Sequence, residues 1–163
     1  MPFAPRRLIR ALGFLTRREI METEKSYTSQ IVKDNEQAIA QALNDGNYVQ
    51  AFLLVHALVE SLLRIFLKET NDRATFSNLI GSYKKFLKRE HYSLPIFIDE
   101  LTKFNQRRNR IVHALWRKGF SLTNRQAEGA AHTAVIMYGL FIEWLETFDP
   151  EIMKAGFEYD EEA

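Results

Sequence analysis

The residues best suited to chemistry in this sequence lie together in RRNRIVHALW, residues 107–116. Arg108 is followed directly by Asn109, and His113 comes four residues after the asparagine. A guanidinium can grip phosphoryl oxygens with two parallel hydrogen bonds, and an imidazole exchanges a proton near neutral pH. These groups could therefore cleave a phosphodiester bond without a metal ion. The plain alternative is a basic helix edge that happens to include a histidine.

The spacing of Arg108, Asn109 and His113 favours a phosphodiester-cleaving site. A shuffled sequence of this composition would contain Arg-Asn followed four residues later by His roughly 0.02 times. At about 100° per residue, the segment has one apolar stripe, made by Leu101, Phe104, Ile111, Val112 and Leu115. Arg108 falls within this stripe, where an unpaired guanidinium costs several kcal/mol unless it faces a wet cleft. Asn109 and His113 are neighbours on its flank. We expect the three polar groups to converge on open solvent space.

Composition limits the class of protein. The chain has 163 residues, 46% of them hydrophobic and 26% charged, which fits one soluble globular domain. The net charge of +1 gives no attraction of the whole protein to nucleic acid, so any basic surface must be local. The absence of cysteine excludes disulfides, thiol nucleophiles and thiolate metal sites. It also fits a reducing compartment, and we expect a cytoplasmic protein.

Charge is distributed unevenly along the chain. Residues 1–18 contain five arginines and no acid, whereas the last six residues, EYDEEA, contain four acids. We expect a basic N-terminal helix or arm over residues 1–20, a helical bundle over 21–150 and an acidic C-terminal tail over 151–163. The N-terminal apolar stretch is interrupted by Arg10, and no small-residue cleavage site follows it. We therefore expect no export. We also expect no membrane span, because no apolar run approaches the length needed to cross a bilayer.

The elements that must position these residues are helices. Apolar periodicity predicts helices over residues 17–43, 48–69, 74–89, about 93–116 and 124–148. NDGN at 44–47 predicts a turn, Thr123 with Gln126 predicts the N-terminal capping box of the last helix, and Pro150 ends it. Residues 48–69 are apolar around most of the helix and should be central. The fold class is an all-α antiparallel bundle of four to five helices, with an extra N-terminal basic helix.

Arg108-Asn109-x-x-x-His113, late in a helical bundle and followed by one last long helix, resembles the signature of the HEPN superfamily (higher eukaryotes and prokaryotes nucleotide-binding domains). The earlier apolar helix AFLLVHALVESLLRIFL, which contains Glu60, resembles the core helix of that family. The likeness covers roughly residues 30–148. The basic N-terminal helix and the acidic tail are not accounted for by it.

The resemblance implies a metal-independent endoribonuclease that works as a homodimer, without cofactors, with a composite site at the dimer interface. The RNA 2′-hydroxyl would attack the adjacent phosphorus. His113 would act as general base or acid, Arg108 would neutralise the phosphoryl oxygens, and Asn109 would orient the imidazole or the phosphate. The residues expected to hold flanking phosphates are Arg107, Arg110, Arg117 and Lys118. A toxin or phage-defence role, with a protein antitoxin or other regulatory partner, is implied by the family alone.

Several alternatives remain open from the sequence. Glu60 could support Arg108 from the neighbouring helix or pair with Arg64 one turn along its own helix. His56 fits a hydrogen-bonded core histidine, and no metal site is expected. Trp116 could stack on a base, but we expect it to pack in the core. The same fold could also be a catalytically inactive module that binds RNA, a nucleotide or a protein. A third reading is an unrelated helical interaction protein with a buried Arg108 ion pair.

Overall fold

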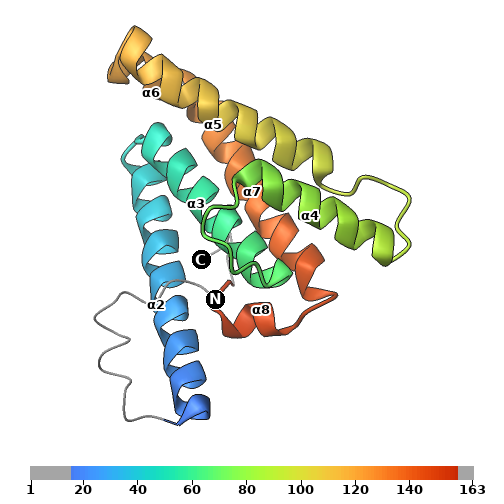
Figure 1. Cartoon of the computed structure of the whole chain (residues 1–163). Coiled ribbons are helices and arrows are strands. Elements are labelled where there is room, and N and C mark those ends of the chain that lie inside the picture. Colours follow the sequence, from blue (N-terminus) through green and yellow to red (C-terminus); the bar gives the residue numbers. More distant parts are fainter. Residues whose placement is uncertain (1–15, 158–163) are drawn as a thin grey trace.

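The computed structural model describes residues 16–157, and within this range it contains helices and no strand (Figure 1). The predicted all-helical class is confirmed. The elements in chain order are α2 (Arg17–Asn44), α3 (Tyr48–Leu67), α4 (Phe76–Arg89), α5 (Ile98–Lys118), α6 (Phe120–Gln126), α7 (Glu128–Glu146) and α8 (Glu151–Lys154). The expected basic N-terminal helix lies outside the described residues, apart from residues 17–20, which belong to α2.

The centre of the bundle is α3, which packs against α2, α4, α5, α6, α7 and α8. Val55, Val59 and Leu62 have no measurable exposure to solvent. Burying one such side chain contributes about 1.5–3 kcal/mol, so this helix supplies much of the stabilisation. By length and composition alone α3 could also cross a bilayer, so the expectation that no apolar run approaches that length is wrong. The core helix of a soluble protein passes the same test, so the absence of a membrane span stays a prediction.

The turn between α2 and α3 is held from a distant part of the chain. NDGN ends α2 as predicted, with Gly46 at φ +71°. The Asn124 side chain of α6 then bridges the turn: its Nδ2 donates to the Gly46 carbonyl at 2.7 Å, and its Oδ1 accepts from the Val49 amide at 3.0 Å. An unpaired amide at the first turn of α3 is thereby satisfied. This bond ties α6 to the start of the central helix.

The segment expected to be a loop after α5 contains a short helix instead. Gly119, at φ +80°, breaks α5 and lets α6 fold back in a tight turn. Thr123 is not the capping residue predicted from its spacing to Gln126. It is buried inside α6, and its hydroxyl donates to the Gly119 carbonyl at 2.7 Å. Figure 1 shows α6 and the C-terminal half of α5 at one end of the bundle, beyond the first turn of α3.

The chain after α7 returns to the core before the acidic tail begins. Asp149-Pro150 ends the last long helix as predicted, but Ile152 of α8 and Phe157 are fully buried. Gly156 has φ +98°, and a Cβ atom there would lie 2.9 Å from the Ser29 backbone. Only glycine fits this close approach of α2. Residues 151–157 therefore belong to the bundle, and the most acidic part of the expected tail, 158–163, lies outside the described residues.

Candidate functional site

A groove of about 570 Å³ runs along α5 where it faces α6 and the start of α7. We call it the cationic groove. Its polar lining is Arg107, Arg110, His113, Arg117, Lys118, Thr123 and Gln126, and its apolar lining is Ile111, Ala114, Ala127 and Ala130. Four of these side chains are cations, and no acidic side chain of the described residues lines the groove. All four are cations that the sequence assigned to RNA binding.

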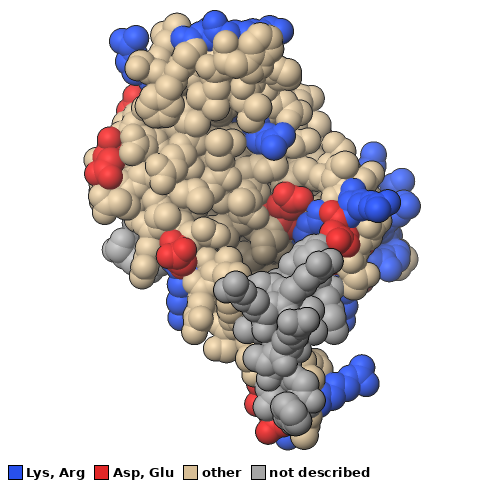
Figure 2. All heavy atoms as spheres, turned by 60° about the vertical axis from the view of Figure 1, so that its left-hand side comes forward, with Lys and Arg blue, Asp and Glu red and all other residues tan. Residues whose placement is uncertain are grey.

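Helical spacing explains why these groups meet. Arg107, Arg110 and Arg117 recur at three- and seven-residue intervals, which places them on one face of α5 over three turns. Three alanines with small side chains also line the groove: Ala114 on α5, Ala127 between α6 and α7, and Ala130 on α7. Arg117 and Lys118 also lie in the last turn of α5, where the helix dipole favours positive charge. Figure 2 shows lysines and arginines along the end of the molecule formed by α5 and α6.

His113 projects into this groove and is exposed to solvent. Its ring lies 6.3 Å from the Trp116 ring, and the Arg117 guanidinium stands 5.1 Å above that indole. An exposed imidazole among guanidinium groups can give or take a proton beside a bound anion. The site therefore combines a cluster of cations with an exposed imidazole.

Arg108 occupies a different flank of α5. His113 comes five positions after Arg108, so the two side chains leave the helix about 140° apart. Arg108 does not line the cationic groove, and its Nη1 donates to Asn109 Oδ1 at 3.2 Å. The convergence of Arg108 and His113 that we expected does not occur within one chain. The reason is geometric, because residues spaced by five cannot share a helix face.

Arg108 is also exposed, although it lies in line with the apolar stripe of α5. Among the described residues it forms no ion pair, so the buried pair with Glu60 or another acid is not found. Glu60 pairs with Arg64 at 3.1 Å, and Arg64 in turn donates to the Asn71 carbonyl at 3.0 Å. Of the two roles considered for Glu60, the structure shows the pairing within its own helix.

His56 is a core histidine, as the sequence indicated. It is 8% exposed, stacks on Phe76 at 4.4 Å, and its Nε2 lies 3.2 Å from Asn105 Oδ1. Burial lowers the pKa of His56; the Asn105 hydrogen bond and Glu60 act in the opposite direction, and Arg108 lowers the pKa further. Arg108 is thus an electrostatic neighbour of the buried His56.

An exposed apolar patch adjoins the candidate site. Trp116 is 71% exposed, which contradicts the expectation that it packs in the core, and Val112 and Phe120 are 38% and 54% exposed. We call these three residues the outer apolar patch. Arg108, Val112 and Trp116 are spaced four apart, so Arg108 heads the same row on α5. This spacing is visible in the sequence. The row is exposed because the C-terminal half of α5 lies at one end of the bundle, and the sequence does not show that.

Comparison with protein-family models, with curated proteins and with solved structures finds no match. Among the described residues, no group of three or more histidine, aspartate or glutamate side chains is placed to hold a metal ion.

Proposed function

We propose that this protein is a metal-independent endoribonuclease of the HEPN type, active as a homodimer. The observation that carries the proposal is the cationic groove, which joins four cations and His113 without an acidic side chain. Such a groove favours a phosphate backbone, whose binding by Lys and Arg releases counterions. RNA is the substrate class because its 2′-hydroxyl supplies the nucleophile within the chain.

The chemistry follows from these groups. His113 takes the proton from the 2′-hydroxyl, whose oxygen attacks the adjacent phosphorus while the bond to the 5′-oxygen breaks. The 5′-oxygen takes a proton from water. The products are a 2′,3′-cyclic phosphate and a 5′-hydroxyl. Arg107, Arg110 and Arg117 hold flanking phosphates, together with Lys118. An arginine on the scissile phosphate stabilises the charge that grows there.

A second copy supplies that arginine in the proposed site. The outer apolar patch, with an exposed tryptophan, is typical of an association surface. If two α5 helices pack antiparallel about a twofold axis at Val112, each Arg108 lies level with the second copy's Trp116. It is then about 4.5 Å along the axis from the second copy's His113. His113 leaves α5 about 100° around the helix from Val112, so the proposal also requires the long Arg108 side chain to reach around the second copy's α5 towards its His113. Asn109 would orient Arg108 through their hydrogen bond.

The alternative function is a catalytically inactive module that binds RNA, a nucleotide or a protein through the same groove. It is favoured by the separation of Arg108 and His113 on one chain, because cations alone suffice for binding. A toxin or phage-defence role, an antitoxin partner and a cytoplasmic location belong to the proposal only through the family resemblance.

The two functions are separated by incubating a labelled single-stranded RNA with the protein in EDTA. We expect cleavage to 2′,3′-cyclic phosphate ends, a loss of at least about 100-fold for His113→Ala, and wild-type activity for His132→Ala. His132 is an exposed histidine of α7 outside the cationic groove. RNA binding without cleavage, unchanged in His113→Ala, would support the inactive module and contradict the enzyme.

A further inference from the structure

One face of the central helix is not covered by the described residues. Ala57, Glu60, Ser61, Arg64 and Lys68 follow one another along α3 at helical spacing, and all line a second groove. We call it the α3 groove. It has a volume of about 890 Å³ and is walled by the first half of α2, by the segment after α3 and by α8. Ala57 is exposed in the middle of the most apolar helix of the bundle.

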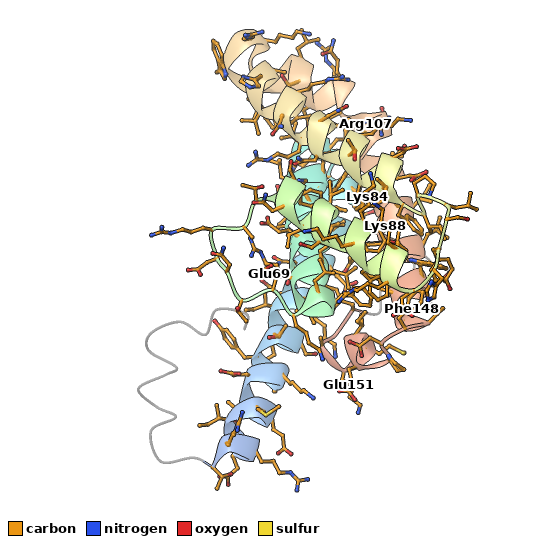
Figure 3. All side chains as sticks on the ribbon, turned by 45° about the vertical axis from the view of Figure 1, so that its right-hand side comes forward. Glu69, Lys84, Lys88, Arg107, Phe148 and Glu151 are labelled. Atoms are coloured by element: carbon orange, nitrogen blue, oxygen red, sulfur yellow. The ribbon has the colours of Figure 1, made fainter. Side chains whose placement is uncertain are left out.

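The floor of the α3 groove is apolar and its rim is charged. Ile20, Met21, Ala57, Ile65 and Ala155 contribute apolar surface, and Met21 is 50% exposed. The acids around it are Glu24, Glu60, Glu69, Asp72, Asp149 and Glu151. Four bases also line the groove, so acids exceed bases by two. Figure 3 labels Glu69 in the segment after α3 and Glu151 at α8, and Figure 2 views the molecule from the α2 side.

Two of the acids are already neutralised. Glu60 pairs with Arg64 at 3.1 Å, and Glu151 pairs with Lys25 at 3.2 Å. Among the described residues, Glu24, Glu69 and Asp72 form no ion pair. These carboxylates stand beside apolar surface, which suits an occupant that carries both apolar and cationic side chains.

We propose that the α3 groove is the docking site of the chain's own residues 1–15. This segment, MPFAPRRLIRALGFL, contains three arginines, no acid, and apolar residues including Phe3, Leu8, Ile9 and Leu12. Its composition matches the groove on both counts, since apolar side chains can cover the floor while Arg6, Arg7 and Arg10 meet the acidic rim. The inference is independent of the proposed ribonuclease function.

Residues 1–15 are also joined to the rest of the chain beside the α3 groove. Residues 1–15 join the described chain at Thr16, and Arg17, Ile20 and Met21 in the first turns of α2 already line the groove. The groove follows α2 from Arg17 to Thr28, a length of about 17 Å along the helix. Fifteen residues span about 22 Å as a helix and up to about 50 Å when extended, so the segment reaches the whole groove.

The test is a paramagnetic broadening experiment on the full chain, which contains no cysteine. A nitroxide is attached at Thr70→Cys, on the rim of the groove, and the amide signals of residues 1–15 are observed. The control label is at Ile136→Cys, 52% exposed on α7 and outside the groove. We expect broadening of residues 1–15 by the label at Thr70→Cys and none by the label at Ile136→Cys.

A blocking variant makes the result specific. Ala57→Trp fills the floor of the groove and should abolish the broadening, whereas Ala40→Trp, at an exposed position of α2 outside the groove, should leave it unchanged. No broadening from Thr70→Cys, or broadening that survives Ala57→Trp, would overturn the proposal. A mixture of two proteins tests for exchange between copies: one carries the nitroxide but no isotope, and the other carries the isotope but no nitroxide. Broadening in this mixture would also overturn the proposal, because another copy's segment would then fill the groove.

Discussion

Asn124 caps the central helix from another part of the chain, with its Oδ1 3.0 Å from the Val49 amide nitrogen of α3. Asn124→Ala would remove this bond and the bond to Gly46, leaving two part-buried backbone groups unsatisfied. We expect a loss of about 1–3 kcal/mol in the free energy of unfolding. Chemical denaturation measures it, with Arg125→Ala, an exposed neighbour, as the control. Equal stability of the two variants would show that the bridge contributes nothing.

The buried His56 predicts a stability that depends on pH. Its folded pKa lies below the ordinary 6.5 because burial disfavours the charged ring. The unfolded chain therefore binds the proton more readily, and the contribution of neutral His56 is complete above pH 6.5 and is lost as the pH falls towards the folded pKa.

Denaturation at about pH 7.5 and about pH 5 measures this effect. His56→Gln should lose less free energy of unfolding over the interval than the wild type does. The exposed His91→Gln serves as the matched control and should retain the wild-type loss. The same pH dependence in all three proteins would show that His56 does not cause the loss of stability at low pH.

The cationic groove predicts a specific change in the salt dependence of RNA binding. Arg117→Ala should weaken binding and reduce the slope of log K against log salt concentration by about 0.7, the value for one phosphate contact with a single strand. Arg89→Ala removes an exposed arginine of α4 outside the groove. Fluorescence anisotropy at several salt concentrations should show no change in slope for that control. An unchanged slope in Arg117→Ala would place the RNA elsewhere.

The outer apolar patch predicts the dimer contact. Trp116→Glu introduces a charge at its most exposed aromatic residue and should convert the protein to a monomer with intact helical content. Ile136→Glu introduces the same charge at a 52% exposed position of α7 and should leave the dimer unaffected. Sedimentation velocity distinguishes these results. A dimer that persists in Trp116→Glu would exclude this patch as the interface.

Local signals in the sequence predicted most of the fold. The NDGN turn, the apolar periodicity of α3 and Asp149-Pro150 fixed several helix ends to within a few residues. The capping role assigned to Thr123 failed because the spacing to Gln126 says nothing of the break at Gly119, which places Thr123 inside α6. The bridge from Asn124 to Val49 spans 75 positions, and no local pattern encodes it.

The candidate site was predicted in part for similar reasons. The four cations expected to hold flanking phosphates, Arg107, Arg110, Arg117 and Lys118, do line one groove, because residues on one helix face stay together in the fold. Whether they bind RNA stays a prediction. Arg108 was expected to meet His113 in open solvent, with a buried ion pair as the alternative, and Trp116 was expected to pack in the core. Both are exposed because α5 extends beyond its neighbours, which depends on how helices are stacked and cannot be read from one helix alone.

The most direct test of a composite site is complementation between two inactive variants. Arg108→Ala and His113→Ala are co-expressed with different tags, and the heterodimer is purified. One of its two sites then combines Arg108 from one copy with His113 from the other, so we expect about half of the wild-type RNA cleavage. Each homodimeric variant should be inactive. A heterodimer that binds RNA but cleaves no more than its inactive parents would contradict the pairing of Arg108 and His113 across two copies.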